Sequence, residues 1–191
     1  MRFIVLDGLD AAGKDTHAEL IKDRYESMGD EVIIRSHPST DNRYGRKAKR
    51  SLLKHGRKEK IKASTYYTLD ILRSIDKHYG EADTVIFVRY LCGVAYLPFP
   101  LAKTAYDFFS GLLPTTDYMF FLDVRPSESL KRLEERNRLE MFENRSDLEK
   151  VRKKALELID DWHIIDTNRT IDEAQADIES ILDELDRKNG H

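Results

Sequence analysis

The chain has 191 residues and a mass of 22.3 kDa, which suffices for one domain with a substantial core. Lys and Arg total 32 against 35 acidic residues, and the net charge of −3 excludes a generally cationic nucleic-acid binder. No stretch approaches the roughly 18 consecutive apolar residues that a membrane span needs. The apolar run at the N-terminus ends at Asp7, too short for a signal peptide. A single cysteine excludes an intramolecular disulfide and a cysteine-rich zinc site. We expect one cytoplasmic domain over residues 1–191, with no nucleic-acid or membrane partner.

Short apolar runs alternate with amphipathic stretches along the chain. The runs are rich in Val, Ile, Phe and Tyr and are mostly continuous, as expected of strands that are buried on both faces. This alternation predicts a three-layer α/β fold around a mostly parallel sheet. The predicted strands are Phe3–Leu6, Glu31–Arg35, Thr84–Val88, Tyr118–Asp123 and Trp162–Asp166. The predicted helices are Asp15–Met28, Lys60–Tyr79, a stretch after Pro100, Ser127–Arg136, Asp147–Asp161 and Ile171–Asp186.

Charge is unevenly distributed over the chain. Residues 43–62 contain ten basic residues and one glutamate, whereas residues 172–186 contain seven acidic residues and no basic one. We interpret the acidic stretch as a solvated helix face. The basic segment follows the second predicted strand and leads into a helix. Two interpretations of it stay open: an electropositive wall of a cleft, or ordinary surface.

The clearest motif directly follows the first predicted strand and opens the first predicted helix. This is the context that a Walker A phosphate-binding loop requires. Its glycines allow successive backbone N–H groups to point inward toward phosphate oxygens, and the helix N-terminus adds partial positive charge. The lysine is expected to reach the β- and γ-phosphates of ATP. The nine residues of the motif are Gly8, Leu9, Asp10, Ala11, Ala12, Gly13, Lys14, Asp15 and Thr16.

One position of the motif departs from the usual pattern. After the lysine a Walker A loop has Ser or Thr, whose hydroxyl binds magnesium, but this chain has Asp15. A carboxylate oxygen is itself a suitable ligand for Mg²⁺. The alternative is that Asp15 only caps the positive end of the helix. We favour Asp15 as the metal ligand.

Further segments fall in the order found in one family of P-loop enzymes. The opening residues 4–16 and the arginine at the end of the third predicted strand, in Val88-Arg89-Tyr90, are the most specific. The other segments are Arg35-Ser36-His37-Pro38, the pair Leu69 and Arg73, Gly93–Tyr96, Phe120–Val124, Arg132–Arg145 and Ile165-Asp166-Thr167. Over nearly its whole length the chain resembles the thymidylate kinases.

The resemblance implies a P-loop kinase fold, with a five-stranded parallel sheet flanked by helices and a mobile lid near residues 132–146. It also implies a homodimer that uses ATP and Mg²⁺ to convert dTMP to dTDP. Two alternatives remain open: a kinase of this fold acting on another nucleotide or a nucleoside, and a nucleotide-binding regulatory protein without transfer activity.

The resemblance also assigns roles to individual residues. Lys14 would serve the donor phosphates, and Arg89 would grip the phosphate of the acceptor. Asp10 would contact the acceptor sugar, and Arg73 the acceptor base or its phosphate. The remaining residues expected to bind the acceptor are Arg35, Leu69 and Tyr96.

The lid would supply a catalytic arginine, because the phosphate loop has Ala11-Ala12 where some thymidylate kinases carry one. The candidates are Arg136 and Arg138, whereas for Arg132 we favour a purely structural pairing with glutamates of its own helix.

Two departures from the family leave the acceptor base open. Leu69 replaces a stacking Phe, and Val88 replaces the acid before Arg89. Tyr66 and Tyr67 are candidates for replacement stacking.

Overall fold

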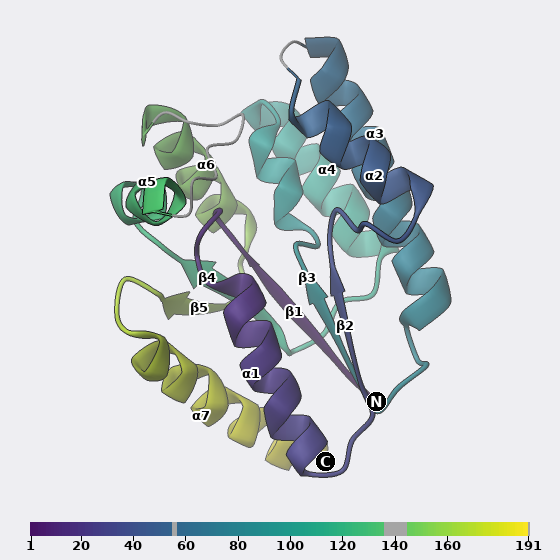
Figure 1. Ribbon diagram of the computed structural model, residues 1–191, viewed down its shortest axis with the longest axis vertical. Helices are drawn as coiled ribbons and strands as arrows, with labels where there is room; N and C mark the ends of the chain where they lie inside the picture. Colours follow the sequence, from purple (N-terminus) through teal and green to yellow (C-terminus); the bar gives the residue numbers. More distant parts are fainter. Residues whose placement is uncertain (55–56, 136–144, 191) are drawn as a thin grey trace.

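The computed structural model describes residues 1–54, 57–135 and 145–190. Its five strands form one parallel sheet in the order β2-β3-β1-β4-β5 (Figure 1). The α/β class and the five-stranded parallel sheet are therefore confirmed. The strands are β1 Arg2–Gly8, β2 Val32–Ser36, β3 Thr84–Val88, β4 Met119–Asp123 and β5 His163–Asp166.

The helices lie close to the predicted ranges, with two additions, α2 and the 3-10 helix η1. They are α1 Lys14–Ser27, α2 Arg43–Leu52, α3 Arg57–His78, the 3-10 helix η1 Cys92–Tyr96, α4 Phe99–Leu112, α5 Pro126–Glu135, α6 Arg145–Leu158 and α7 Ile171–Asn189. None of the described helices is both long and apolar enough to cross a membrane.

The core lies along the central strands, as their continuous apolar runs predict. Every residue of β3 is buried, and so are the five inner residues of β1. The edge strands β2 and β5 are only partly covered, which fits their more polar ends. Because β1 is central and ends at Gly8, the phosphate loop emerges from the middle of the sheet.

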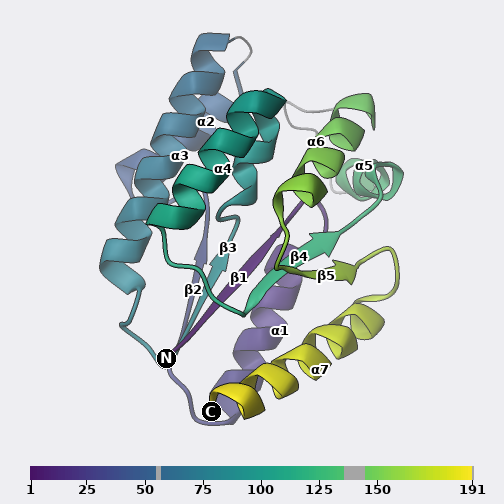
Figure 2. The same ribbon diagram turned by 180° about the vertical axis from the view of Figure 1, so that it is seen from behind.

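Helices cover both faces of the sheet. Helix α1 packs on β1, β2 and β3, and α7 packs on α1 and β5. Helices α4 and α6 pack on each other and on η1, and they lie in front of the strands when the molecule is seen from behind (Figure 2). The carboxyl ends of the strands open toward α2, α4 and α5 (Figure 1).

The basic segment contains a helix that the sequence analysis did not predict. Asn42 caps α2, because its side chain accepts hydrogen bonds from the backbone N–H groups of Tyr44 and Gly45. The buried residues of α2 are small and allow close packing against α3; they are Gly45, Ala48 and Ser51. The arginines and lysines between them point outward, so this part of the basic segment is an exposed helix face.

Both ends of the chain meet at the amino edge of the sheet. The Arg2 guanidinium lies 2.8 Å from an Asp186 carboxylate oxygen of α7 and 2.6 Å from an Asp30 oxygen. The hydroxyls of Tyr25 and Tyr118 also donate to Asp186. This nearly buried cluster joins β1, α1, α7 and the residues just before β2 and β4, far from the carboxyl edge where the phosphate loop lies.

Candidate active site

The phosphate loop adopts a backbone that favours glycine. Gly8, Ala11 and Gly13 all have positive φ angles, of 142°, 56° and 89°. A Cβ atom added at Gly8 would lie 2.3 Å from the carbonyl oxygen of Leu122 in β4, so no side chain fits there. Gly13 is the N-cap of α1 and offers no side-chain cap, which leaves the first N–H groups of the helix available to an anion.

Lys14 folds back into this loop. Its Nζ atom donates hydrogen bonds to the carbonyl oxygens of Gly8 at 2.9 Å and Leu9 at 2.6 Å. Burial, and secondarily the nearby Arg89, lower the pKa of Lys14 to about 8. The ammonium therefore lies inside the loop, where a bound phosphate would meet it.

Arg89 and Asp15 face each other beside the loop. Two guanidinium nitrogens of Arg89 lie 3.3 Å from the two carboxylate oxygens of Asp15, and the Ser36 hydroxyl donates to Asp15 at 2.8 Å. Asp10 lies on the other side of the guanidinium, at 3.9 Å. Burial alone would raise the pKa of Asp15, but the pairing with Arg89, the Ser36 hydrogen bond and the nearby Lys14 together outweigh burial and lower the pKa.

Arg89 has a strained backbone. Its φ is 64°, in the left-handed region, which costs a residue other than glycine on the order of 1–3 kcal/mol. The residue directly follows β3, at the carboxyl edge where parallel α/β sheets bind ligands. The geometry thus directs a cation toward the space beside the phosphate loop.

Side chains of helix α5 donate hydrogen bonds to the backbone of the phosphate loop. The Arg132 guanidinium pairs with Glu128 one turn earlier, at 2.9 Å, as the structural interpretation of this residue expects. It also donates to the carbonyl oxygens of Ala11 and Thr167, and the Ser129 hydroxyl donates to the carbonyl oxygen of Asp10. Arg132 therefore fixes the loop backbone as well as its own helix.

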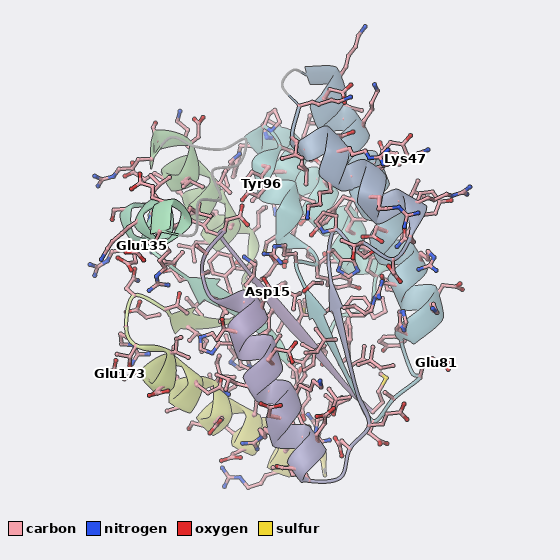
Figure 3. The ribbon with its side chains drawn as sticks, viewed as in Figure 1. Asp15, Lys47, Glu81, Tyr96, Glu135 and Glu173 are labelled. Carbon is pink, nitrogen blue, oxygen red and sulfur yellow. The ribbon has the colours of Figure 1, made fainter. Side chains whose placement is uncertain are left out.

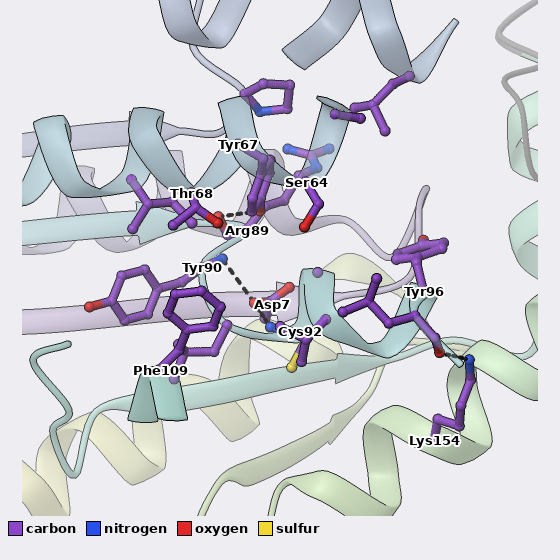
Figure 4. A pocket seen from close by; sticks show the side chains of 18 of the residues that line it. Asp7, Ser64, Tyr67, Thr68, Arg89, Tyr90, Cys92, Tyr96, Phe109 and Lys154 are labelled. Atoms are coloured by element: carbon purple, nitrogen blue, oxygen red, sulfur yellow. Dashed lines mark hydrogen bonds between the residues drawn. The ribbon is translucent and has the colours of Figure 1, made fainter. Parts of the chain in front are cut away.

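A cavity of about 920 Å³ adjoins the loop (Figure 4). Its polar end is formed by Asp10 and Arg89, and its walls are largely apolar side chains from α3, η1 and α4. The volume is within the range of roughly 300–1,000 Å³ that is typical of small-molecule sites. Asp15 and Tyr96 both lie at this carboxyl edge of the sheet, whereas Glu81 lies at the opposite edge (Figure 3).

The structure brings only some of the expected acceptor residues to this cavity. Asp10, Arg89 and Tyr96 line it, but Arg35, Leu69 and Arg73 do not. Arg35 and Arg73 instead meet at Asp41, at 3.0 Å and 3.7 Å. Leu69 is 36% exposed. The expected base-holding pair thus does not line this cavity. The α3 residues that do are Ile61, Ala63, Ser64, Tyr67, Thr68 and Ile71.

Five further positions are placed as follows. The side chains of Leu9 and Ala12 are buried, so within the loop these residues offer a phosphate only their backbone. Val88 is fully buried in the core, and a carboxylate at that position would be buried too. Arg136 and Arg138, the expected catalytic arginines of the lid, lie outside the described residues.

The sequence analysis missed one charged residue that organises the site. Asp7 is 3% exposed, and one of its oxygens accepts hydrogen bonds from the backbone N–H groups of Tyr90 and Cys92, both at 2.9 Å (Figure 4). The sequence contained a signal for Asp7, because this residue is a charged residue near the end of an otherwise apolar strand. A charge that is buried there needs hydrogen-bond partners.

Asp15 offers oxygen atoms that fit a magnesium ion. Its side chain is 63% exposed and lies one residue after the lysine of the loop. Magnesium keeps several waters and needs few protein ligands, so the lack of a cluster of three metal-binding side chains in the described part of the chain does not conflict with this role. Both oxygens of Asp15 face Arg89, however, so a bound ion would compete with that pairing.

A Walker A loop at the end of a central strand, a buried lysine within it and an arginine at the neighbouring strand end define a P-loop nucleotide-binding protein. The family model described as thymidylate kinase matches residues 6–178. The chain belongs to the thymidylate kinase family, which consists of ATP-dependent phosphotransferases.

Individual relatives agree with this placement. The chain is 26% identical over 185 residues to a probable thymidylate kinase of Archaeoglobus fulgidus, with 94% of each chain covered. It is 29% identical over 192 residues to a probable thymidylate kinase of Methanococcus aeolicus, with 93% of each covered. The solved structure of Candida albicans thymidylate kinase has the same fold, with a TM-score of 0.70, 19% identity, and 99% of this chain and 92% of that chain covered.

Proposed function

We propose that the protein transfers the γ-phosphate of ATP to a nucleoside monophosphate, with dTMP as the favoured acceptor and dTDP as the product. The observation that carries this proposal is the placement of two cations at adjoining sites. Lys14 lies inside the phosphate loop, and Arg89 lines the neighbouring cavity. Phosphoryl transfer depends mainly on positioning and on neutralising the charge of the two phosphate groups.

The two sites would bind different reactants, the phosphate donor and the phosphate acceptor. The loop N–H groups and Lys14 would bind the phosphates of ATP, and the planar fork of Arg89 suits an acceptor phosphate at the polar end of the cavity. Asp10 lines the same end and would contact the acceptor sugar. Magnesium, when bound, would neutralise phosphate charge, and Asp15 would be its ligand from the protein.

The base of the acceptor would lie deeper in the cavity, against α3. Tyr67 presents its ring there and Tyr96 lines the opposite side, from η1. The family and the names of the relatives favour thymine as this base. The hydroxyls of Ser64 and Thr68 can both donate and accept, so they restrict the base less than an arginine would. These hydroxyls favour a second candidate function, a kinase of this fold that acts on other nucleoside monophosphates.

The test is ADP release from ATP with dTMP, dUMP, dCMP, dGMP, UMP and thymidine as acceptors. We expect the highest kcat/KM with dTMP. A preference for another acceptor would support the second candidate, and ATP binding without turnover on any acceptor would indicate a regulatory nucleotide-binding protein.

From its family membership we also propose that the protein is a homodimer and that it is located in the cytoplasm. Sedimentation analysis of the purified protein tests the first, and imaging of a fluorescent fusion tests the second.

A further inference from the structure

The backbone on both sides of Arg89 is held by hydrogen bonds. In the peptide unit before it, the Val88 carbonyl oxygen accepts from the N–H of His37, and the Arg89 N–H donates to the carbonyl of Leu6, both at 3.0 Å. These two bonds connect β3 to its neighbours on either side. They fix the orientation of the first peptide plane.

The peptide unit after Arg89 is held by two side chains. Its carbonyl oxygen accepts a hydrogen bond of 2.7 Å from the Tyr67 hydroxyl of α3. Its N–H group, which belongs to Tyr90, donates to Asp7 at 2.9 Å (Figure 4). With both peptide planes fixed, Arg89 has no freedom to leave its left-handed conformation without breaking one of these bonds.

Asp7 also links this backbone to the phosphate loop. The residue immediately precedes Gly8, and its second carboxylate oxygen accepts from the Gly8 N–H at 3.1 Å. The same side chain therefore contacts the first residue of the loop and the segment that follows Arg89. Burial and the nearby Asp7 raise the pKa of Tyr67, so its hydroxyl stays protonated and remains a donor.

We propose that Asp7 and Tyr67 are positioning residues that hold Arg89 in its left-handed conformation and so aim its guanidinium at the acceptor phosphate. This inference rests on the proposed function. It differs from a packing role because the two side chains bind the polar groups of a single peptide unit, the one that follows a strained arginine.

The most direct test is Tyr67→Phe, which removes the hydroxyl and keeps the ring against the cavity. We expect the KM for the acceptor to rise about tenfold or more, the KM for ATP to change less than about twofold, and the melting temperature to fall only slightly. The matched control is Tyr79→Phe. Tyr79 directly follows α3, and phenylalanine there keeps the ring that packs edge-on against Phe3, so its kinetics should equal those of the wild type.

A double-mutant cycle shows whether Tyr67 acts through Arg89. In an Arg89→Ala background, Tyr67→Phe should cause no further loss of acceptor use. Equal losses in both backgrounds would contradict the positioning role. Asp7→Asn, which keeps the side-chain size but loses the charge, should raise the acceptor KM further than Tyr67→Phe, and an unchanged KM would contradict the role of Asp7.

A crystal structure of Tyr67→Phe gives an answer that does not depend on turnover. We expect Arg89 to leave its left-handed conformation and to lose its pairing with Asp15. An unchanged Arg89 in that structure would overturn the inference even if the proposed reaction is correct. Lack of turnover by the wild-type protein would instead overturn the proposed function.

Discussion

Arg89 and Asp15 form a two-pronged ion pair across the carboxyl edge of the sheet, with both nitrogen–oxygen distances at 3.3 Å. One partner is our candidate for the acceptor phosphate and the other our candidate for magnesium. Each charge is thus neutralised by the other. Ligand binding would replace this pairing with contacts to phosphate and metal.

Asp15→Ala should raise the magnesium concentration needed for half-maximal ADP production, because the mutation removes the carboxylate best placed to hold the ion. The measurement is a magnesium titration at fixed ATP and acceptor. Asp23→Ala is the matched control, since Asp23 is an exposed acid on the same helix. If Asp15→Ala works at the wild-type magnesium level and binds Mg·ATP equally well, the carboxylate is not a metal ligand.

Arg89→Ala should weaken use of the acceptor by about 2–4 kcal/mol, since a charge-assisted and potentially bidentate contact is lost. ATP binding should suffer less, because Lys14 and the N–H groups of the loop are expected to bind the donor phosphates. Separate titrations of ATP and acceptor measure both effects. Arg187→Ala in α7 is the control, and an equal loss of both ligands in Arg89→Ala would point to a structural role.

Lys14 should make ATP binding depend on pH. With a pKa lowered to about 8, its amine is cationic below that pH and neutral above it. Affinity for ATP should therefore fall on the order of tenfold between pH 7 and pH 9, and binding near pH 8 should take up a proton. Calorimetry in buffers of different ionisation enthalpy measures this uptake.

Lys14→Arg is the control for this pH dependence, because arginine stays charged throughout the range. Wild-type affinity that is flat from pH 7 to pH 9 would contradict the assigned pKa. Lys14→Ala should abolish transfer while leaving the protein folded. Turnover at the wild-type rate by that folded variant would show that the loop does not bind the donor phosphates.

Gly8→Ala should destabilise the protein by more than about 1 kcal/mol, because the added Cβ would meet the backbone of Leu122 at 2.3 Å. Urea denaturation gives the free energy of unfolding. Gly111→Ala is the comparison: it lies in α4 with open space around it and should stabilise by roughly 0.5–1 kcal/mol. Equal stability of the two variants would show that the loop backbone relaxes at little cost.

The fold was predictable where the chain has strong periodic patterns. Buried strands such as Thr84–Val88 were placed correctly because every residue is apolar or β-branched. Helix α2 was missed because its inward face consists of Gly45, Ala48 and Ser51, which look like polar or loop residues until α3 packs closely against them. Its charge pattern was compatible with an electropositive cleft wall or with ordinary surface, and neither interpretation specified a helix.

The position of the phosphate loop could be predicted because a sequence motif fixes its geometry. The residues of α3 that face the cavity were harder to predict, because they depend on how the helix is rotated about its axis. The Leu69–Arg73 pair has the four-residue spacing of the family, but the face of α3 that meets the cavity carries Ser64, Tyr67 and Thr68. Asp7 was not predicted because its role lies in backbone contacts with residues more than 80 positions away.

The contact between Arg2 and Asp186 joins residues 184 positions apart, and this separation bears on how the protein forms during its own synthesis. Strand β1 leaves the ribosome before its sheet partners, which begin at Thr84 and Met119, and before its ionic partner in α7. Long-range contacts of this kind slow folding, because the chain must close a large loop before they contribute. The strand that leads into the phosphate loop therefore acquires all its native neighbours only after α7 has been translated.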